Sequence, residues 1–420
     1  MQLLTISLLV YLSCCTLCQA EDNNDIQKRQ LVPDAGENPF WRDAETAFHF
    51  RSFGMDRDRE HTADSQAWAA GGILRFTSGW WRQRLQLAAG GYGSLGLLSP
   101  DDKPGTQLLT SRQHSITTLG EANATIKLTP NSHLKLGRQT LDLPFINADD
   151  ARMVPNAHEA YLLDIKPSAD TDWLLGFISR IKRRDRERFI WMSAQAGASG
   201  SRGGLALAHL RHRFSAQTEF MISNQHSLDL YNNLYAEFKT AFKLMDNLPL
   251  KFSVQGTYQR ATGAKRLGDF NTNSFGMLLN TDYLGFGWSL AATTTAENTQ
   301  LLRPYGVTPS YLSLIVQDFD RPGEDAVMFG LSYDFSRIGI NNLSGFTKFV
   351  RSWTPDTGRF ASPDQSELNV TLDYHFKKNL LEGLWLRLRY AKVEQYGVGA
   401  NDMRDFHIIL NYSLPLGKIK

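Results

Sequence analysis

The sequence predicts an all-β fold, a transmembrane antiparallel β-barrel of about 18 strands with long outer loops and short periplasmic turns. Segments with strictly alternating apolar and polar residues recur along the chain. Their apolar faces often end in an aromatic residue, and short and long connections alternate between them. A soluble β-sandwich would also show the alternation, because its strands too have one wet face. The aromatic residues and the rhythm of the connections therefore decide in favour of the barrel.

The first residues read as a secretory signal peptide over 1–20. A short apolar run without charge, Leu3 to Leu12, is followed by small and polar residues that end at Cys18-Gln19-Ala20. The run is too short to span a bilayer as a helix, which takes roughly 20 apolar residues. All 3 cysteines lie inside this segment, so we expect a mature chain without disulfides, thiolate metal sites or a cysteine nucleophile. Residues 21–44 form an N-terminal polar, periplasmic segment in this interpretation, and 45–420 form the pore domain.

Period-two alternation defines the strands. In Leu368 to Phe376 every even position is apolar or aromatic, whereas the odd positions are polar. The same reading along the chain predicts strands at 45–53, 67–77, 82–93, 117–128, 132–141, 158–166, 171–180, 204–214, 217–224, 230–243, 249–260, 272–284, 286–295, 326–336, 345–353, 367–376, 384–394 and 405–414.

The connections between these strands alternate in length. Short turns are expected at 129–131, 167–170, 215–216 and 245–249. Long loops are expected at 54–66, 94–116, 142–157, 181–203, 261–271, 296–325, 354–366 and 395–404. Outer-membrane barrels pair short periplasmic turns with long outer loops, and a soluble sandwich has no reason to keep this rhythm.

The charge balance argues against a nucleic-acid binder, because the formal net charge is only +2. A basic run from Arg180 to Arg188 is interrupted by Asp185 and Glu187 and lies in a predicted outer loop. Contact with lipopolysaccharide phosphates, or plain solvation, explains this run better than nucleic acid does.

Signatures of an enzyme are weak. The sequence contains no Gly-x-Ser-x-Gly elbow, Walker loop or His-Glu-x-x-His motif. His209 and His212 share one strand but have no third ligand nearby, so neither a metal nor a cofactor is predicted. A barrel-embedded outer-membrane hydrolase and a soluble secreted binding module remain as alternatives from other classes.

The alternation also predicts which side chains face the lumen. If the apolar positions face lipid, eight basic side chains point inward: Arg51, Arg75, Lys127, Lys135, Lys251, Arg387, Arg389 and His407. Asn123, Thr125, Gln255, Asn369 and Asp373 share that surface. Rings of basic side chains select for anions, so such a lumen would attract carboxylates, phosphates or sulfates. The alternative is that these residues merely solvate a wet lumen and pair with Asp and Glu across strands.

Three stretches resemble the OprD-type substrate-specific porins, a family that includes chitoporins and small-carboxylate channels. The first runs from Leu136-Gly137-Arg138-Gln139 to Asp149-Asp150-Ala151-Arg152-Met153-Val154-Pro155-Asn156. The second runs from Pro304-Tyr305-Gly306 through Phe319-Asp320-Arg321-Pro322-Gly323-Glu324-Asp325 into Tyr333-Asp334-Phe335. The third covers Leu386 to Tyr390 and Asn411-Tyr412-Ser413-Leu414-Pro415-Leu416. The C-terminus departs from the pattern, since such barrels usually end in an aromatic residue and this chain ends in Lys420.

The resemblance implies a monomeric barrel of about 18 strands whose third and seventh outer loops fold inward to form the constriction. Counting strands independently places 142–157 and 296–325 in those two loops. The expected constriction residues are Asp149, Asp150 and Arg152 in the third loop and Arg321 in the seventh. Arg138 lies on the lipid-facing parity, so its expected inward orientation rests on the resemblance and on a local bend near the end of its strand.

These observations together predict an outer-membrane porin and no enzyme. We expect passive, selective diffusion of small polar solutes, with carboxylates as the first choice and chito-oligosaccharides as the second. The remaining expected partners are outer-membrane lipid with lipopolysaccharide and the barrel assembly machinery, and no nucleic acid.

Overall fold

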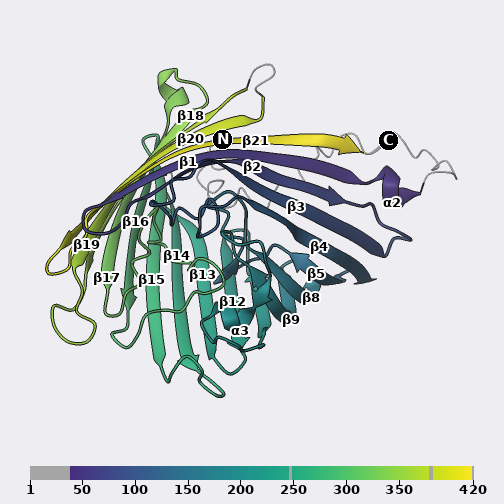
Figure 1. Ribbon diagram of the computed structural model, residues 1–420, viewed down its shortest axis with the longest axis horizontal. Helices are drawn as coiled ribbons and strands as arrows, with labels where there is room; N and C mark the ends of the chain where they lie inside the picture. The colour runs from purple at the N-terminus through teal and green to yellow at the C-terminus, as the bar shows by residue number, and fades with distance from the viewer. Residues whose placement is uncertain (1–37, 246–247, 378–381, 419–420) are drawn as a thin grey trace.

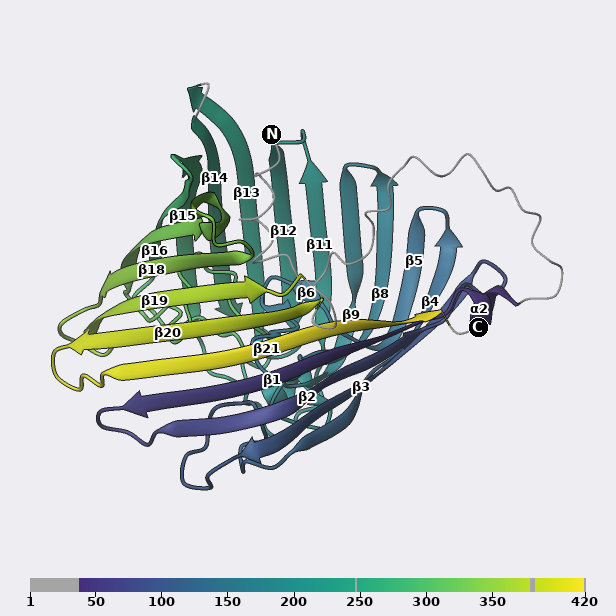
Figure 2. The ribbon, with the colours of Figure 1, turned by 90° about the horizontal axis from the view of Figure 1, so that it is seen from above.

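The computed structural model describes residues 38–245, 248–377 and 382–418, so the expected signal peptide lies outside the described residues. One antiparallel sheet of 19 strands dominates the fold. Apart from the two-residue β10 (Ile190–Trp191), its members form a closed barrel of 18 strands. The barrel closes because β1 (Glu45–Arg59) pairs with both β2 (Ser65–Thr77) and β21 (Met403–Lys418). Figures 1 and 2 show β1 and β21 lying side by side.

The order of strands around the barrel follows the sequence, and each predicted strand overlaps one of the barrel strands. The remaining strands are β3 (Leu85–Leu98), β4 (Ile116–Thr129), β5 (Ser132–Gln139), β8 (Ala157–Ser168), β9 (Thr171–Lys182), β11 (Leu205–Arg213), β12 (Thr218–Ser227), β13 (Tyr231–Met245), β14 (Leu248–Ala261), β15 (Asn271–Tyr283), β16 (Phe286–Thr295), β17 (Asp325–Asp334), β18 (Leu343–Trp353), β19 (Asp364–His375) and β20 (Leu384–Tyr396).

The predicted loop 54–66 is wrong. Strand β1 continues to Arg59 and β2 begins at Ser65, so only 60–64 connect them. The charged residues of this stretch stay in the strand because its backbone pairs with both β2 and β21, and Arg57 forms an ion pair with Asp405 on β21 at 2.5 Å. The loop predicted at 395–404 likewise shortens to 397–402.

Short elements complete the described chain. Strands β6 (Asp142–Leu143) and β7 (Ile146–Asn147) form a small hairpin within the third outer loop. The helices are α2 (Pro39–Arg42), α3 (Met192–Gln195) and the 3₁₀ helix η1 (Phe335–Ile338). No helix in the described ranges combines the length and apolar character needed to cross a bilayer.

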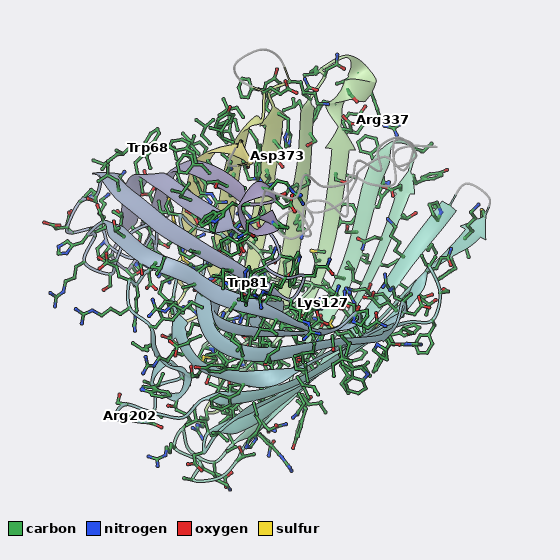
Figure 3. The ribbon with its side chains drawn as sticks, turned by 90° about the vertical axis from the view of Figure 1, so that its right-hand side faces the viewer. Trp68, Trp81, Lys127, Arg202, Arg337 and Asp373 are labelled. Atoms are coloured by element: carbon green, nitrogen blue, oxygen red, sulfur yellow. The ribbon has the colours of Figure 1, made fainter. Side chains whose placement is uncertain are left out.

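The outward faces carry exposed apolar side chains, as a lipid-facing surface requires. Leu290 and Phe329, directly opposite each other on β16 and β17, are 57% and 47% exposed. Aromatic rings cluster at the turn ends of these strands, where Phe286 packs on Tyr333 with ring centroids 4.7 Å apart. Figure 3 shows Arg202 and Arg337 at opposite ends of the barrel, with Arg337 beside the turns and Arg202 among the long loops.

The buried apolar clusters lie where loops fold into the lumen. Met153 and Val154 of the third outer loop, L3 (140–156), pack in one cluster with Phe53 and Met55 of β1. Leu312 and Phe319 of the seventh outer loop, L7 (296–324), pack in another cluster that includes Val350 of β18. Burial of this apolar surface fixes both loops inside the barrel.

Candidate functional site

Loop L3 is attached to the lumen wall through Arg51, which projects inward from β1. Its guanidinium forms an ion pair with Asp150 at 2.8 Å and also donates to the carbonyl oxygen of Arg152. The Nε atom of Arg51 donates to Asn411 on β21 at 2.7 Å. Arg51, which was predicted to face the lumen, thus lies with two of the residues predicted for the constriction, Asp150 and Arg152, at one point of the wall.

Arg152 holds L3 to a second loop. Its Nε donates to the backbone oxygen of Thr106 at 2.9 Å, within the second outer loop, L2 (99–115). Only 8% of Arg152 is exposed, and burial lowers its pKa to about 9, helped by the nearby Arg184. The guanidinium remains charged at neutral pH, and its hydrogen bond to Thr106 holds L3 against L2.

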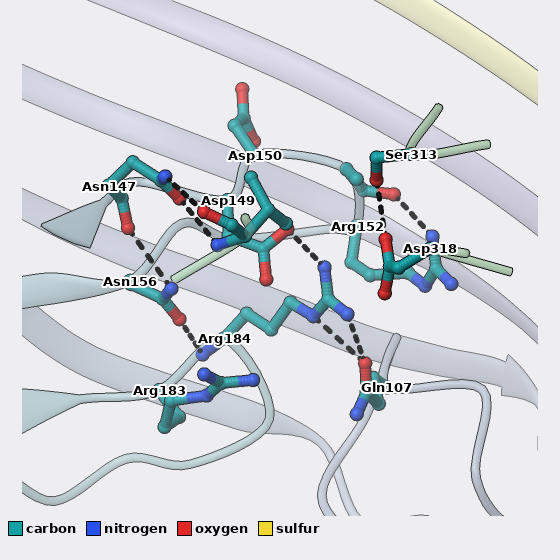
Figure 4. A network of polar contacts seen from close by, with 12 residues as sticks. Gln107, Asn147, Asp149, Asp150, Arg152, Asn156, Arg183, Arg184, Ser313 and Asp318 are labelled. Carbon is teal, nitrogen blue, oxygen red and sulfur yellow. Dashed lines mark hydrogen bonds and ion pairs between the residues drawn. The ribbon is translucent and has the colours of Figure 1, made fainter. Parts of the chain in front are cut away.

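Asp149 is the centre of the polar network in Figure 4. It forms an ion pair at 2.5 Å with Arg184, whose guanidinium also contacts Gln107 of L2. The backbone N–H of Arg184 donates to Asn156 at 2.9 Å. Burial raises the pKa of Asp149, whereas the Arg184 charge opposes that rise. L2, L3 and the fourth outer loop, L4 (183–204), thus share one network.

The basic run in L4 corrects the sequence analysis, which treated all of it as outer surface. Arg184 points to L3, and Arg183 donates to the backbone oxygen of Pro304 in L7 at 3.2 Å. Sequence reasoning missed both because a run of charges resembles a solvated loop. Only the non-local contact between loops shows their direction.

Loop L7 is held to the opposite wall by carboxylates. The backbone N–H groups of Val316 and Gln317 donate to Glu367 on β19 at 3.0 and 2.8 Å. The hydroxyl of Tyr311 donates to Glu237 on β13 at 2.9 Å. These two contacts therefore anchor L7 to the barrel wall at β19 and at β13.

Loops L3 and L7 meet at a reciprocal amide contact. Asn147 donates through Nδ2 to the oxygen of Val307, whose N–H donates back to Asn147 Oδ1, each at 3.0 Å. Gly306 permits this approach, because a Cβ atom there would lie 2.6 Å from Asn147 Oδ1. We call Asn147, Gly306 and Val307 the loop joint.

Arg321 lies near the base of L7 rather than at the joint. It forms an ion pair with Glu324 at 2.7 Å and donates to the backbone oxygen of Pro363 at 2.8 Å. These contacts neutralise its charge and attach L7 to the eighth outer loop.

Two basic residues expected on the wall are paired with acids. Arg387 faces Asp373 with hydrogen bonds of 2.7 and 2.8 Å, and Arg75 forms an ion pair with Glu121 at 2.5 Å. Arg389 lies opposite Thr371 and His407 in the sheet, and Lys127 is exposed opposite His133. The alternative weighed for the basic residues, pairing across strands, therefore holds for Arg387 and Arg75.

Arg138 does not face the lumen. It lies opposite Glu159, whereas its neighbours on the other face, Lys135 and Gln139, line a wall cavity of about 220 Å³. The Arg138 guanidinium stacks on Phe189 at 4.5 Å. The inward orientation expected for it is wrong, because β5 pairs with β8 without a register shift as far as Gln139, so Arg138 stays on the face of Leu136.

The residues that the structure describes contain no group of three or more His, Cys, Asp or Glu placed to hold a metal ion. The site is instead a meeting point of four loops, in which carboxylates and guanidinium groups position L3 and L7 across the lumen. Such an arrangement narrows the lumen and sets the electrostatic potential along it.

Comparisons with known proteins show the same fold. The chain is similar to two crystal structures from Pseudomonas aeruginosa, OccK9 (OpdG) and OpdK with vanillate, at 23% and 21% identity and a TM-score of 0.81 each. Both alignments cover 90% of this chain and 100% of the other. OccAB1 of Acinetobacter baumannii is 18% identical with a TM-score of 0.79, over 90% of this chain and 98% of that one.

A search of curated proteins finds no match. A sequence profile described as outer membrane porin, OprD family, matches residues 38–416. The chain therefore belongs to the OprD family of outer-membrane porins.

Proposed function

We propose that this porin is a passive channel selective for small anionic solutes, with carboxylates as the main class. The observation that carries the proposal is the charge around L3. Four guanidinium groups meet there, those of Arg51, Arg152, Arg183 and Arg184. Two carboxylates, Asp149 and Asp150, pair with Arg184 and Arg51, and the neighbouring Asp318 pairs with Arg303, so the four guanidinium groups keep an excess of positive charge.

This excess supports anion selectivity on electrostatic grounds. A unit charge 4 Å from a solute carboxylate contributes about 4 kcal/mol at an effective dielectric constant of 20. The paired acids reduce this attraction but do not cancel it. A related barrel, OpdK, was solved with vanillate, which is itself a carboxylate, and this supports the same solute class.

Ion selectivity in planar bilayers tests the proposal. We expect purified protein to give single-channel conductance and a reversal potential of the anion-selective sign under a salt gradient. Liposome swelling with aromatic and aliphatic carboxylates should exceed swelling with neutral sugars of equal size. Swelling by chito-oligosaccharides alone would favour that class, and hydrolysis of lipid or peptide without conductance would favour an enzyme.

Arg183 offers a specific variant. We expect Arg183→Gln to shift the reversal potential toward cations and to reduce carboxylate flux about threefold to tenfold, more at low than at high salt. Arg202→Gln is the matched control, because Arg202 is an exposed arginine of the same loop. Equal reversal potentials for the two variants would show that L4 does not contribute to ion selectivity.

A further inference from the structure

The outer surface of the barrel changes from apolar to charged within one step along β5, β8 and β9. Leu136, Tyr161 and Phe177 lie opposite one another and face outward, and Tyr161 and Phe177 are 46% and 36% exposed. The next outward positions on β5 and β8 are Arg138 and Glu159, and a β-bulge at Ser179 on β9 brings Arg180 opposite Glu159. Strand geometry separates the two layers by roughly 7 Å.

This charged layer lies toward the long loops, at the outer edge of the lipid-facing band. Aromatic residues mark the interface of a membrane barrel, so the layer directly beyond Tyr161 lies at the height of the lipid headgroups. A side chain at this height meets lipid phosphates instead of bulk solvent.

The guanidinium groups of the layer are held in place by aromatic rings of L4. Arg138 stacks on Phe189 at 4.5 Å and Arg180 stacks on Trp191 at 4.7 Å. Arg180 forms only a long ion pair with Glu159, at 3.9 Å, and its side chain is 39% exposed. Arg138 also donates one N–H to the backbone oxygen of Leu119 at 3.4 Å. Stacking fixes the orientation of each guanidinium and leaves its other N–H groups for an anion.

Loop L4 adds further cations beside this layer. The backbone of Thr117 donates to the Glu187 carboxylate at 2.9 Å, and Thr118 donates to the Glu187 carbonyl oxygen at 2.8 Å. This attachment places L4 against the outer end of β4, next to Arg138. Arg186 and Arg188 flank the attachment and are both exposed.

We propose that Arg138, Arg180, Arg186 and Arg188 form a binding site for the phosphates of lipid A, the membrane anchor of lipopolysaccharide. We call these four residues the rim arginines. Their four positive charges exceed the three negative charges of Glu159, Asp185 and Glu187. The exposed Tyr161, Phe177 and Leu119, which is 49% exposed, lie along the same wall and contact the acyl chains. The combination of a cationic rim over an apolar wall matches a lipid that carries phosphates above acyl chains.

Native mass spectrometry of the detergent-solubilised barrel tests the site with bisphosphorylated lipid A as the probe. We expect one lipid A per barrel, at an affinity that falls about tenfold or more in the Arg138→Gln/Arg180→Gln/Arg188→Gln variant. Arg260→Gln is the control, because Arg260 is an exposed arginine that follows the outward Tyr258 on β14. Dephosphorylated lipid A should bind the unchanged protein as weakly as lipid A binds the triple variant, and millimolar inorganic phosphate should not compete.

The single variant Arg188→Glu covers the case in which the triple variant does not fold, since Arg188 is exposed. It should lower the affinity for lipid A while the heat-modifiable gel shift of the folded barrel stays unchanged. Equal affinity of the Arg188→Glu, Arg260→Gln and unchanged proteins would overturn the proposal. Equal binding of phosphorylated and dephosphorylated lipid A would do the same.

Discussion

The ion pair between Arg387 and Asp373 determines what β20 contributes to the field in the lumen. Both side chains point inward, and two hydrogen bonds of 2.7 and 2.8 Å join them. A paired guanidinium presents a dipole to a passing solute, whereas an unpaired one presents a full charge. The acid therefore controls how strongly the arginine acts.

Asp373→Asn should increase anion selectivity, because it removes one negative charge and leaves the Arg387 charge uncompensated. Arg387→Gln should shift the reversal potential in the opposite direction. In both variants the change should be larger at low salt, where the Debye length exceeds about 10 Å. Reversal potentials in a salt gradient measure the effect, and shifts of the same sign in the two variants would contradict it.

Asp320 in L7 gives the channel a dependence on pH. Burial raises the pKa of Asp320 from its ordinary value of 3.8 to about 6, although Arg303 lies beside it and opposes the rise. As the pH falls through 6 the carboxylate takes up a proton, so L7 loses one negative charge. We expect anion selectivity to rise between pH 7 and pH 5. Asp320→Asn should show the higher selectivity at both pH values, and an unaltered pH response in that variant would assign the change to another group.

At the scale of elements, the strands could be predicted because each has one apolar and one polar face, a pattern local to the sequence. The inward parity of Arg51, Arg387 and Arg389 followed from the same rule. The directions of Arg183 and Arg184 could not be predicted, since they depend on L3 and L7 folding against L4. When a loop is buried by another loop that is distant in the sequence, its own sequence shows no periodic pattern that would reveal the burial.

The loop joint connects L3 to L7, so the two loops cross the lumen as one unit. Gly306→Val should separate them, because a side chain there would meet the Asn147 amide at 2.6 Å. We expect a larger single-channel conductance with more current noise, and swelling by larger sugars. Gly256→Val on β14 is the control, because nothing lies within 4 Å of a Cβ there and, as at Gly306, the backbone φ is not positive. Equal conductance of the two variants would show that the loop joint does not lie at the narrowest part of the channel.

At the scale of the whole molecule, the ends of the chain meet where β1 pairs with β21, and one buried ion pair crosses this seam. Arg57 and Asp405 lie 2.5 Å apart and are 13% and 0% exposed at their side chains. Removing Arg57 leaves the buried Asp405 carboxylate with the His407 ring beside it, at 3.1 Å. Breaking a buried ion pair in this way typically costs about 3–5 kcal/mol.

Arg57→Met should therefore lower the temperature at which the barrel loses its heat-modifiable gel mobility. The double variant Arg57→Met/Asp405→Leu should recover part of the loss, because no charge is then left buried alone. A double variant less stable than Arg57→Met would show that the pair acts through packing.

The attachment of L3 to the seam has a consequence for assembly. Arg51 lies on β1, and it contacts Asn411 on β21 and Asp150 in L3 at once. If the two end strands paired two residues out of place, Arg51 and Asn411 would be displaced by roughly 7 Å along the strands. The hydrogen bond to Asn411 would then be lost, whereas the contact of Arg51 with L3 would remain. Arg51 can bind L3 and β21 at once in only one register of the end strands, so a folded L3 that orients Arg51 favours that closure of the barrel.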